Sequence, residues 1–305
     1  ERPPLSKEYL AGTRTAERLL LRPPSFWAER QIEIRTNTRI GQVTERRAVA
    51  ADGRSFRFQT MVWAAGGHPR QLVCKGADLA GVHLLRTRDD ADRLLAALAG
   101  ARRVVLVGGG YVGLETAATL RTRGKEVTIV EKEPRLLARV AAQPVSDFYL
   151  AQHRAHGVEV LLDASVAALA GSGRVEGVLL QDGRMLAADL VVVGIGLVPS
   201  TAPLGLDPLD VDGHCRTALP GIYAVGDCAR HASRYAGGAR IRIESVQNAV
   251  DMAKAAAAHI VHGDDAPPYD SCPWFWSNQY DLRLQTVGHA LGHDQTVVRG
   301  RPEAG

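Results

Sequence analysis

The hydrophobic residues of this chain fall into short apolar runs, several of which end in glycine. The clearest run, Val104–Val107, leads directly into Gly108–Gly110, and a second run follows at Val127–Val130. Between them, apolar residues recur at helical spacing as far as Gly124. The pattern predicts a βαβ unit made of a strand at 103–107, a helix from Gly110 to about Arg123 and a strand at 127–130.

The same reading predicts an α/β chain throughout. Met61–Gly67 has the pattern of a buried strand that breaks into glycine where a ligand approaches the backbone. We expect helices near 7–21, 89–98, 148–156 and 243–262, and strands at 32–35, 40–44, 56–65, 158–162, 175–180, 190–193 and 222–225. The segment from Pro273 onwards is expected to be mostly β.

Composition adds bounds on size and location. With 305 residues, 46% hydrophobic residues and 31 glycines, the chain can form two or three domains with packed cores. No apolar run reaches the roughly 18 residues needed to cross a bilayer, and Glu1–Pro4 does not resemble a signal peptide. We therefore expect a cytoplasmic protein that does not bind membranes.

The net charge of the chain indicates which kinds of partner to expect. The net charge is +4, and arginines such as Arg14, Arg18 and Arg22 could form either a solvated face or a surface that steers an acidic protein partner. Aromatic residues are not interleaved with these basic residues, which argues against nucleic acid as a partner.

Cysteine and histidine spacing predicts no metal and no redox disulfide. Cys74, Cys215, Cys228 and Cys272 never form a CxxC pair, so we expect buried, reduced thiols. The histidine pairs have helical spacing, but no carboxylate or cysteine set near them completes a metal shell in the sequence. These pairs are 153 and 156, 259 and 262, and 289 and 293.

Each glycine of the turn after Val107 has a mechanical task. Gly108 permits the tight turn, Gly110 lets the backbone approach a pyrophosphate, and Gly113 lets the helix pack closely on the strand. Glu131 follows at the end of the next strand, where its carboxylate would accept hydrogen bonds from a ribose diol and repel a 2′-phosphate. The unit therefore predicts dinucleotide binding, with NADH favoured over NADPH.

A second signature suggests a second cofactor. The strand at 222–225 ends in Gly226-Asp227, where a carboxylate can meet a sugar-like hydroxyl chain. The helix that opens after Ser245 has free backbone donors that could face an anionic reduced ring. Two sites in one chain predict electron transfer between two bound cofactors.

Several motifs occur together in the order found in one protein family. They are ERPPLSKEYL (1–10), LLRTRDDA (84–91), VGGGYVGLE (107–115), VVVGIGLVP (191–199), GIYAVGDCA (221–229), ESVQNAVDMA (244–253) and PWFWSNQYDLRLQ (273–285). With these motifs the chain resembles the FAD-dependent NADH:ferredoxin reductases, which feed Rieske oxygenases and bacterial cytochrome P450 systems. The resemblance covers nearly all of the chain.

The resemblance implies two Rossmann-like nucleotide-binding domains in a glutathione reductase-like architecture, plus a C-terminal α+β domain. The FAD domain would comprise 1–78 and 196–265, the NAD domain 79–195, and a partial C-terminal domain 266–305. Family members begin with their own strand and GxGxxG for FAD and continue beyond Gly305, so we expect both ends of the family's fold to be missing from this chain. The partner would be an acidic [2Fe-2S] ferredoxin, and the protein a monomer or weak dimer.

The resemblance also implies site residues. Lys7 would lie beside the flavin ring and pair with Glu115, an arrangement that is physically sensible because an ammonium stabilises the negative charge of a reduced flavin. A glutamate satisfied by backbone donors alone is the alternative. FAD contacts would come from Arg2, Pro3, Lys7, Ile40, Ala65, Gly66, Arg86, Gly226, Asp227, Ser245, Val246 and Trp276, and NADH contacts from Gly109, Gly110, Tyr111, Val112, Gly113, Glu131, Ile195 and Gly196.

Some alternatives stay open at this point. Trp276 could cover the flavin edge towards the partner or simply pack in the core. Another flavin oxidoreductase of the same architecture is a second reading of the whole chain, for example an NADH oxidase or a nitrite reductase subunit. A third is a non-enzymatic flavoprotein that resembles the apoptosis-inducing flavoproteins.

Overall fold

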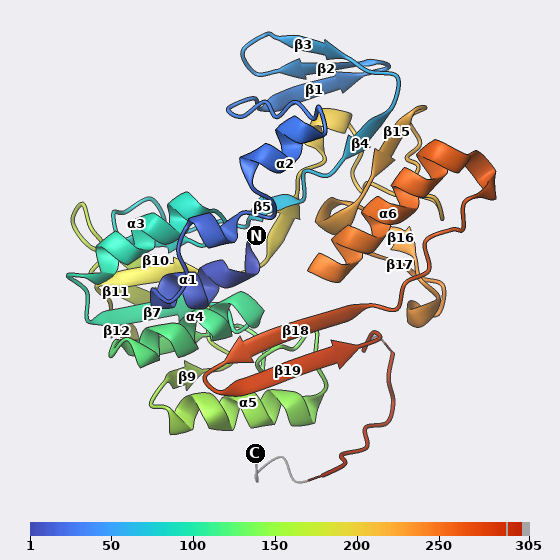
Figure 1. Ribbon diagram of the computed structural model, residues 1–305. Coiled ribbons are helices and arrows are strands. Elements are labelled where there is room, and N and C mark those ends of the chain that lie inside the picture. The colour runs from blue at the N-terminus through green and yellow to red at the C-terminus, as the bar shows by residue number, and fades with distance from the viewer. Residues whose placement is uncertain (291, 301–305) are drawn as a thin grey trace.

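A five-stranded parallel sheet forms the centre of one half of the molecule. The computed structural model describes residues 1–290 and 292–300 (Figure 1), so Leu291 and residues 301–305 of the predicted C-terminal domain lie outside the described residues. The strands, in spatial order, are β6 (Val82–Leu84), β13 (Leu190–Val193), β7 (Arg103–Val107), β8 (Glu126–Val130) and β9 (Glu159–Leu161). All neighbouring strands of this sheet run parallel.

This sheet is covered on both faces, which explains its continuous apolar strands. Val104 and Leu106 of β7 pack against the helices, whereas Val105 and Val107 pack against a second, antiparallel sheet. The helices are α3 (Arg88–Leu98), α4 (Tyr111–Thr122) and α5 (Gln143–Ala155), and the antiparallel sheet consists of β10 (Val166–Ala170), β11 (Gly177–Leu180) and β12 (Met185–Ala187).

The other half of the molecule is built from two segments of the sequence, residues 24–69 and 197–262. Trp63 Nε1 donates a 2.7 Å hydrogen bond to the carbonyl of Ser200, which ties the segments together. The elements are β1 (Ile40–Thr44), β2 (Arg47–Ala50) and β3 (Ser55–Arg57) in one sheet, the parallel pair β4 (Met61–Trp63) and β15 (Ile222–Ala224), the antiparallel pairs β5 (Gly67–Pro69) with β14 (Leu197–Pro199) and β16 (His231–Ala232) with β17 (Arg240–Ile241), and the helices α2 (Pro24–Glu29) and α6 (Val246–His262).

A C-terminal hairpin spans the two halves. Strands β18 (Trp274–Gln279) and β19 (Leu282–Val287) pair in antiparallel register, and β18 contacts both α4 and α6. Figure 1 shows the hairpin running beneath α6 on one side and beside α4 and α5 on the other. The predicted β character is confirmed at 274–287, while the described residues after Val287 form no strand.

The short helical stretch predicted near 7–21 is confirmed only in two separate parts. The structure has a 3-10 turn at Pro3–Ser6, a short helix α1 (Glu8–Ala11) and another 3-10 turn at Glu17–Leu19. Gly12 ends α1 because it adopts a left-handed conformation with φ of 81°, which closes the helix as a C-cap.

Three further predictions about elements are corrected. The segment 32–35 forms no strand, since none of the described strands pairs with it, and Ile32 and Ile34 stay exposed. The strand predicted at 56–65 is divided into β3 and β4 because the two parts pair with different partners, β2 and β15. Helix α5 begins at Gln143 rather than near 148, with a proline in its first turn that is compatible with a helix start.

Candidate nucleotide and redox site

The glycine turn between β7 and α4 has the backbone geometry that the sequence predicts. Gly108 adopts φ of 109°, and a Cβ at this position would lie 2.4 Å from the Gly194 carbonyl oxygen. A Cβ at Gly113 would lie 2.1 Å from the Gly108 oxygen, so only glycine allows α4 to approach the turn this closely. At Gly110, by contrast, a Cβ would meet nothing within 4 Å, which leaves open space where the helix begins.

The carboxylate of Glu131 lies against this turn. Its Oε2 accepts a 2.5 Å hydrogen bond from the Gly109 amide, and its Oε1 accepts one of 2.9 Å from the Glu133 amide. The side chain is thus placed at the carboxyl end of β8, beside the start of α4. This is the position from which an acidic residue meets a ribose in dinucleotide-binding folds.

The loop after β13 closes the same region from the neighbouring strand. Gly194 donates a 2.8 Å hydrogen bond to the Val107 carbonyl, so Ile195 and Gly196 follow directly beside the glycine turn. Gly196 has φ of 101° and lies near the guanidinium of Arg139. Val112, on the first turn of α4, keeps 44% of its surface exposed.

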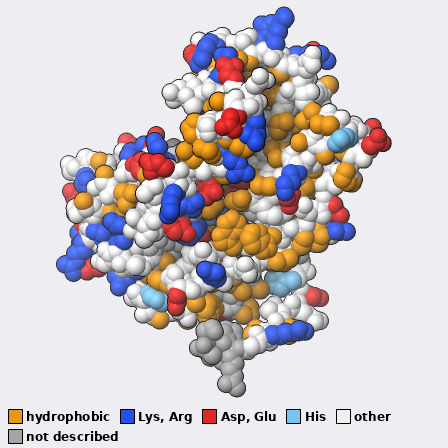
Figure 2. Space-filling model, in the orientation of Figure 1, with side chains coloured by type: hydrophobic (Ala, Val, Ile, Leu, Met, Phe, Trp, Pro, Cys, Tyr) orange, Lys and Arg blue, Asp and Glu red, His pale blue; other side chains and the backbone are white. Residues whose placement is uncertain are grey.

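Aromatic side chains of β18 reach the start of α4. The rings of Tyr111 and Phe275 lie 4.3 Å apart between centroids, and Trp276 stacks on Trp274 at 5.2 Å. Burial raises the pKa of Tyr111, so the phenol stays neutral. Figure 2 shows hydrophobic side chains gathered near the middle of one face of the molecule. Trp274 of β18 is 36% exposed.

Glu115 is the best-anchored side chain of the site. Its Oε2 accepts hydrogen bonds from Lys7 Nζ at 2.8 Å and Ser6 Oγ at 2.6 Å, and its Oε1 accepts one from Ser277 Oγ at 2.7 Å. The Lys7 and Glu115 side chains are only 11% and 5% exposed. The carboxylate is therefore held by three side chains from two separate segments, the N-terminal segment and β18, and not by backbone donors.

A desolvated ion pair of this kind depends on complete satisfaction of its polar atoms. Removing one partner of a buried pair costs about 3–5 kcal/mol, because the remaining charge is left without compensation. Both serines reduce that cost by donating to the carboxylate. Sequence reasoning missed Ser6 and Ser277 as partners of Glu115. The only available signal was that both occur within the family motifs.

A second charged cluster surrounds Gly66. Arg86 Nη2 lies 3.1 Å from Asp227 Oδ2, and Arg86 Nε donates to the Gly67 carbonyl at 3.2 Å. A Cβ at Gly66 would lie 3.3 Å from the Arg86 guanidinium and 3.8 Å from that of Arg2. Desolvation, and then the charge of Arg86, lowers the pKa of Arg2. The cluster holds two guanidinium groups and one carboxylate, so it carries excess positive charge and attracts an anion.

The start of α6 completes this side. Ser245 is buried, and its Oγ accepts a 3.1 Å hydrogen bond from the Asn248 amide as the N-cap of the helix. Val246 remains 43% exposed at the first helical position. Gly226 adopts φ of 74°, and a Cβ there would lie 3.2 Å from Ala249 of α6. Gly226-Asp227 and the α6 terminus are therefore close neighbours.

The remaining predicted residues lie in the same two halves of the molecule. Pro3 opens the 3-10 turn between Arg2 and Lys7, and Ala65 lies in the exposed stretch between β4 and β5. Ile40 is half-buried in β1 and packs against the hydrophobic core around β15 and α6. The binding role of each residue stays a prediction.

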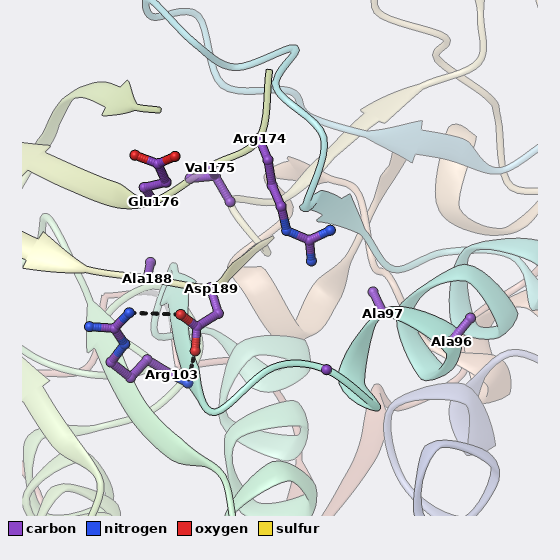
Figure 3. A pocket seen from close by; sticks show the side chains of 9 residues that line it. Ala96, Ala97, Arg103, Arg174, Val175, Glu176, Ala188 and Asp189 are labelled. Carbon is purple, nitrogen blue, oxygen red and sulfur yellow. Dashed lines mark hydrogen bonds and ion pairs between the residues drawn. The ribbon is translucent and has the colours of Figure 1, made fainter. Parts of the chain in front are cut away.

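A separate hollow lies in the sheet half of the molecule. It has a volume of about 490 Å³, and Figure 3 shows Ala96 and Ala97 of α3 on one side and Asp189 with Arg103 on the other. None of the residues predicted to bind a cofactor lines it. The Asp189 carboxylate is bound to Arg103 there, and the Glu176 carboxylate also lines the hollow.

The cysteine prediction is half right. All four cysteines are free, and Cys215 and Cys228 are buried. Burial raises the pKa of Cys215 to about 12, which makes the thiol unreactive. Cys74 and Cys272 are only partly buried, because both lie in irregular segments rather than in a core strand.

Two protein-family models match this chain. Residues 1–253 match the family model described as pyridine nucleotide-disulphide oxidoreductase. The chain belongs to this family. Residues 274–305 also match a model described as reductase C-terminal. The predicted α/β fold class is confirmed, while the division into three domains at the stated boundaries stays a prediction.

Relatives within this family include named ferredoxin reductases. The chain is 50% identical to the 5,5′-dehydrodivanillate O-demethylase ferredoxin reductase subunit of Sphingobium sp. strain SYK-6, over 99% of this chain and 75% of the relative. It is 41% identical to putidaredoxin reductase of Pseudomonas putida, over 98% of this chain and 73% of the relative.

A solved structure agrees with the fold. The ferredoxin reductase for the CYP199A2 system from Rhodopseudomonas palustris matches with a TM-score of 0.94 and 38% identity, over 99% of this chain and 76% of that chain. Across residues 1–290 and 292–300, no helix has both the length and the apolar character required to span a membrane.

Proposed function

We propose that this chain is an NADH-dependent ferredoxin reductase, which passes electrons through FAD to a [2Fe-2S] ferredoxin that supplies an oxygenase. The observation that carries the proposal is the 2.8 Å ion pair between Lys7 and Glu115. Lys7 follows the 3-10 turn that begins after Arg2, and Glu115 follows the glycine turn on α4. One ion pair therefore connects the predicted flavin site to the predicted nicotinamide site.

The charged cluster around Gly66 supports FAD binding. Arg2 and Arg86 offer positive charge to an anionic group, and Asp227 offers a carboxylate to a hydroxyl chain. The left-handed backbone at Gly66 and Gly226 lets a ligand approach without a Cβ in the way. The proposed FAD domain comprises 1–78 and 196–265.

The open space at Gly110 supports NADH binding. Free amide groups at the start of α4 favour a pyrophosphate there, and Glu131 is placed to accept hydrogen bonds from ribose hydroxyls. The same carboxylate would repel the 2′-phosphate of NADPH. We place the NAD domain at 79–195 and the C-terminal domain at 266–305.

The protein's side chains would orient the bound cofactors and place charge beside them. Bound FAD would supply the redox chemistry, namely two-electron oxidation of NADH and one-electron delivery to the acceptor. Lys7 presents a fixed positive charge, Glu115 holds its ammonium group, and Ser6 and Ser277 hold the carboxylate. Tyr111 and Phe275 form an aromatic wall beside the start of α4, which excludes water from this region.

The choice of partner rests on the relatives. The Sphingobium relative is named as the ferredoxin reductase subunit of a demethylase, and a solved structure at 38% identity and a TM-score of 0.94 is a covalent complex of putidaredoxin reductase with putidaredoxin. The net charge of +4 suits an acidic ferredoxin, and the Trp274–Trp276 stack offers an exposed aromatic contact for it. The protein would act in the cytoplasm, where NADH is regenerated, as a monomer or weak dimer.

Two measurements on the full-length protein test the proposal. Anaerobic titration with NADH should bleach the absorbance of the oxidised flavin, and cytochrome c reduction should then depend on an added [2Fe-2S] ferredoxin. Flavin bleaching with rapid oxygen consumption and no ferredoxin dependence would support an NADH oxidase instead. Slow bleaching with neither activity would support a non-enzymatic flavoprotein.

A further inference from the structure

A cluster of His214, His259 and Asp264 lies at the end of α6 that is remote from the predicted flavin site. His259 is in the last turn of this 17-residue helix, Asp264 lies in the 3-10 turn that follows, and His214 comes from the loop before β15. Sequence spacing pairs His259 with His262, so the cluster is visible only in the tertiary structure. One ligand atom of each residue lies within 4.8 Å of the other two.

The distances within the cluster suit a transition-metal ion. His259 Nε2 and Asp264 Oδ1 are 3.3 Å apart. Two ligands bound to one tetrahedral zinc ion at about 2.1 Å each lie roughly 3.4 Å apart, so this pair already has the required separation. The ring of His214 lies against that of His259, with centroids 4.5 Å apart, and one of its nitrogens lies within 4.8 Å of the ligand atoms of the other two residues.

The second nitrogen of His259 is already arranged as in known metal sites. Tyr223 OH lies 2.8 Å from His259 Nδ1, in a buried contact between β15 and α6. A metal-bound histidine usually donates its other ring N–H to an oxygen, which fixes the tautomer and the ring orientation. Tyr223 can accept that hydrogen, which leaves the Nε2 lone pair directed at Asp264.

His214 has a ring nitrogen that lacks a hydrogen-bond partner among the described residues. This atom, Nδ1, is buried. Unpaired buried polar atoms are uncommon because they lose their hydration without replacement. A metal ion bound to the cluster would fix the orientation of this ring and compensate for part of that loss.

The nearby positive charge does not prevent binding. Arg216 Nη1 lies 3.6 Å from Asp264 Oδ1, but Arg216 Nε is already bound to Asp212 Oδ2 at 2.6 Å. Asp264 is 86% exposed, so its carboxylate can turn towards an ion without breaking any buried contact. Water can fill the remaining coordination position from the same exposed side.

We propose that His214, His259 and Asp264 form a binding site for a divalent ion of the zinc type. Two imidazoles and one carboxylate are the ligand set that zinc accepts, whereas magnesium and calcium prefer oxygen ligands. The ion links the loop at 212–216, the end of α6 and the start of the segment that leads to β18. The Tyr269 amide donates to the carbonyl of Gly213 in the same loop, so the ion fastens the connection between the α6 region and the C-terminal hairpin.

Zinc titration of the untagged holoenzyme tests this proposal. We expect the wild-type protein to bind one more equivalent of Zn²⁺ by calorimetry than either His214→Ala or Asp264→Asn. Saturating Zn²⁺ should also raise the melting temperature of the wild-type protein by roughly 5 °C, and should raise it less in both variants. Co²⁺ bound at the same site should give visible absorption bands of a low-coordinate ion.

His262→Ala is the matched control, since His262 is exposed on the same helix end and lies outside the cluster. This variant should keep the zinc stoichiometry and the thermal shift of the wild-type protein. Asp264→Asn changes an exposed side chain, so it should fold even if His214→Ala does not. Equal zinc stoichiometry in wild type and Asp264→Asn would overturn the proposal. So would a wild-type protein that binds no zinc at about 100 micromolar, because its Kd would then be weaker than that concentration, which corresponds to about 5 kcal/mol of binding free energy.

Discussion

Ser277 of β18 donates a 2.7 Å hydrogen bond to Oε1 of Glu115 on α4, although 162 residues separate the two in sequence. The other oxygen of the carboxylate is bound by Lys7 and Ser6. The C-terminal hairpin and the N-terminal segment therefore hold one buried acid from opposite sides. A change in the hairpin should therefore alter the position of Lys7, which we place beside the flavin.

Ser277→Ala should lower both stability and the rate of flavin reduction. It leaves one oxygen of a buried carboxylate without its donor, which costs about 1–3 kcal/mol of unfolding free energy. The loosened carboxylate should also hold Lys7 less firmly and slow the reduction by NADH in stopped-flow measurements. Asn278→Ala is the control, because successive side chains of a strand point to opposite faces. A Ser277→Ala protein with wild-type reduction kinetics would contradict the proposed role of the serine.

Gly110→Ala should weaken NADH binding without harming the fold. A Cβ at Gly110 meets no protein atom within 4 Å, so the variant should melt like the wild type. The added methyl group would occupy the space proposed for the pyrophosphate and should raise the Kd for NADH about ten-fold or more, which is about 1.4 kcal/mol. Gly100→Ala, also in open space, serves as the control. Unchanged NADH affinity in Gly110→Ala would show that the dinucleotide binds elsewhere.

Gly113→Ala should behave differently from Gly110→Ala. The new Cβ would lie 2.1 Å from the carbonyl oxygen of Gly108, so α4 would have to move away from the turn. We expect a lower melting temperature together with weaker NADH binding. A normal melting temperature for this variant would mean that the helix packs less tightly on the strand than the structure indicates.

Glu131→Arg should shift the coenzyme preference towards NADPH. The substitution removes the carboxylate that would repel a 2′-phosphate and supplies a guanidinium that can bind it. The ratio of kcat/KM for the two coenzymes measures the shift. Glu133→Arg makes the same change of charge two residues away, and its coenzyme preference should stay that of the wild type. Equal ratios in the two variants would remove Glu131 from the coenzyme site.

Asp227→Ala should yield protein that has lost most of its flavin. The change removes the carboxylate paired with Arg86 and the acceptor that we propose for the FAD hydroxyl groups. The ratio of flavin absorbance to protein absorbance after purification measures the loss. Asp210→Ala breaks another Asp–Arg pair, with Arg230, and should keep its flavin. Full flavin occupancy in Asp227→Ala would rule out the assignment.

Asp189 should contribute to stability in a pH-dependent way. The hydrogen bond from the Arg103 side chain lowers the pKa of Asp189 to about 2 (Figure 3), and the backbone amides of Arg102 and Arg103 also donate to it. Because the pKa is lower in the folded protein than in the unfolded chain, the stabilisation is present above about pH 4 and is lost as the pH falls towards 2. The group is partly exposed, so we expect about 1 kcal/mol at neutral pH.

Urea unfolding of Asp189→Asn at a series of pH values tests this contribution. The variant should be less stable than the wild type at pH 7, and the difference should shrink as the pH is lowered from about 4. Asp281→Asn removes the same charge from an exposed position and should show little difference at any pH. A constant difference between wild type and Asp189→Asn would indicate that ionisation of Asp189 plays no part.

Local patterns were sufficient to predict the βαβ unit, helix α6 and the β character of the C-terminal segment. The continuous apolar run at Val104–Val107 specified a strand buried on both faces, and Gly108, Gly110 and Gly113 specified the turn after it. The pairing of Lys7 with Glu115 was also expected, but only because the motifs around both residues resemble a known family. Their spacing alone contains no information about that contact.

The amino-acid sequence by itself therefore determined the βαβ unit, the glycine turn and the charges available near it, because these depend on interactions between residues close together in the chain. Only the tertiary structure decided that Ser6 and Ser277 hold Glu115, that 32–35 forms no strand, and that His214 meets His259 and Asp264. Such contacts form when distant segments pack together, and a strand exists only where another strand accepts its hydrogen bonds.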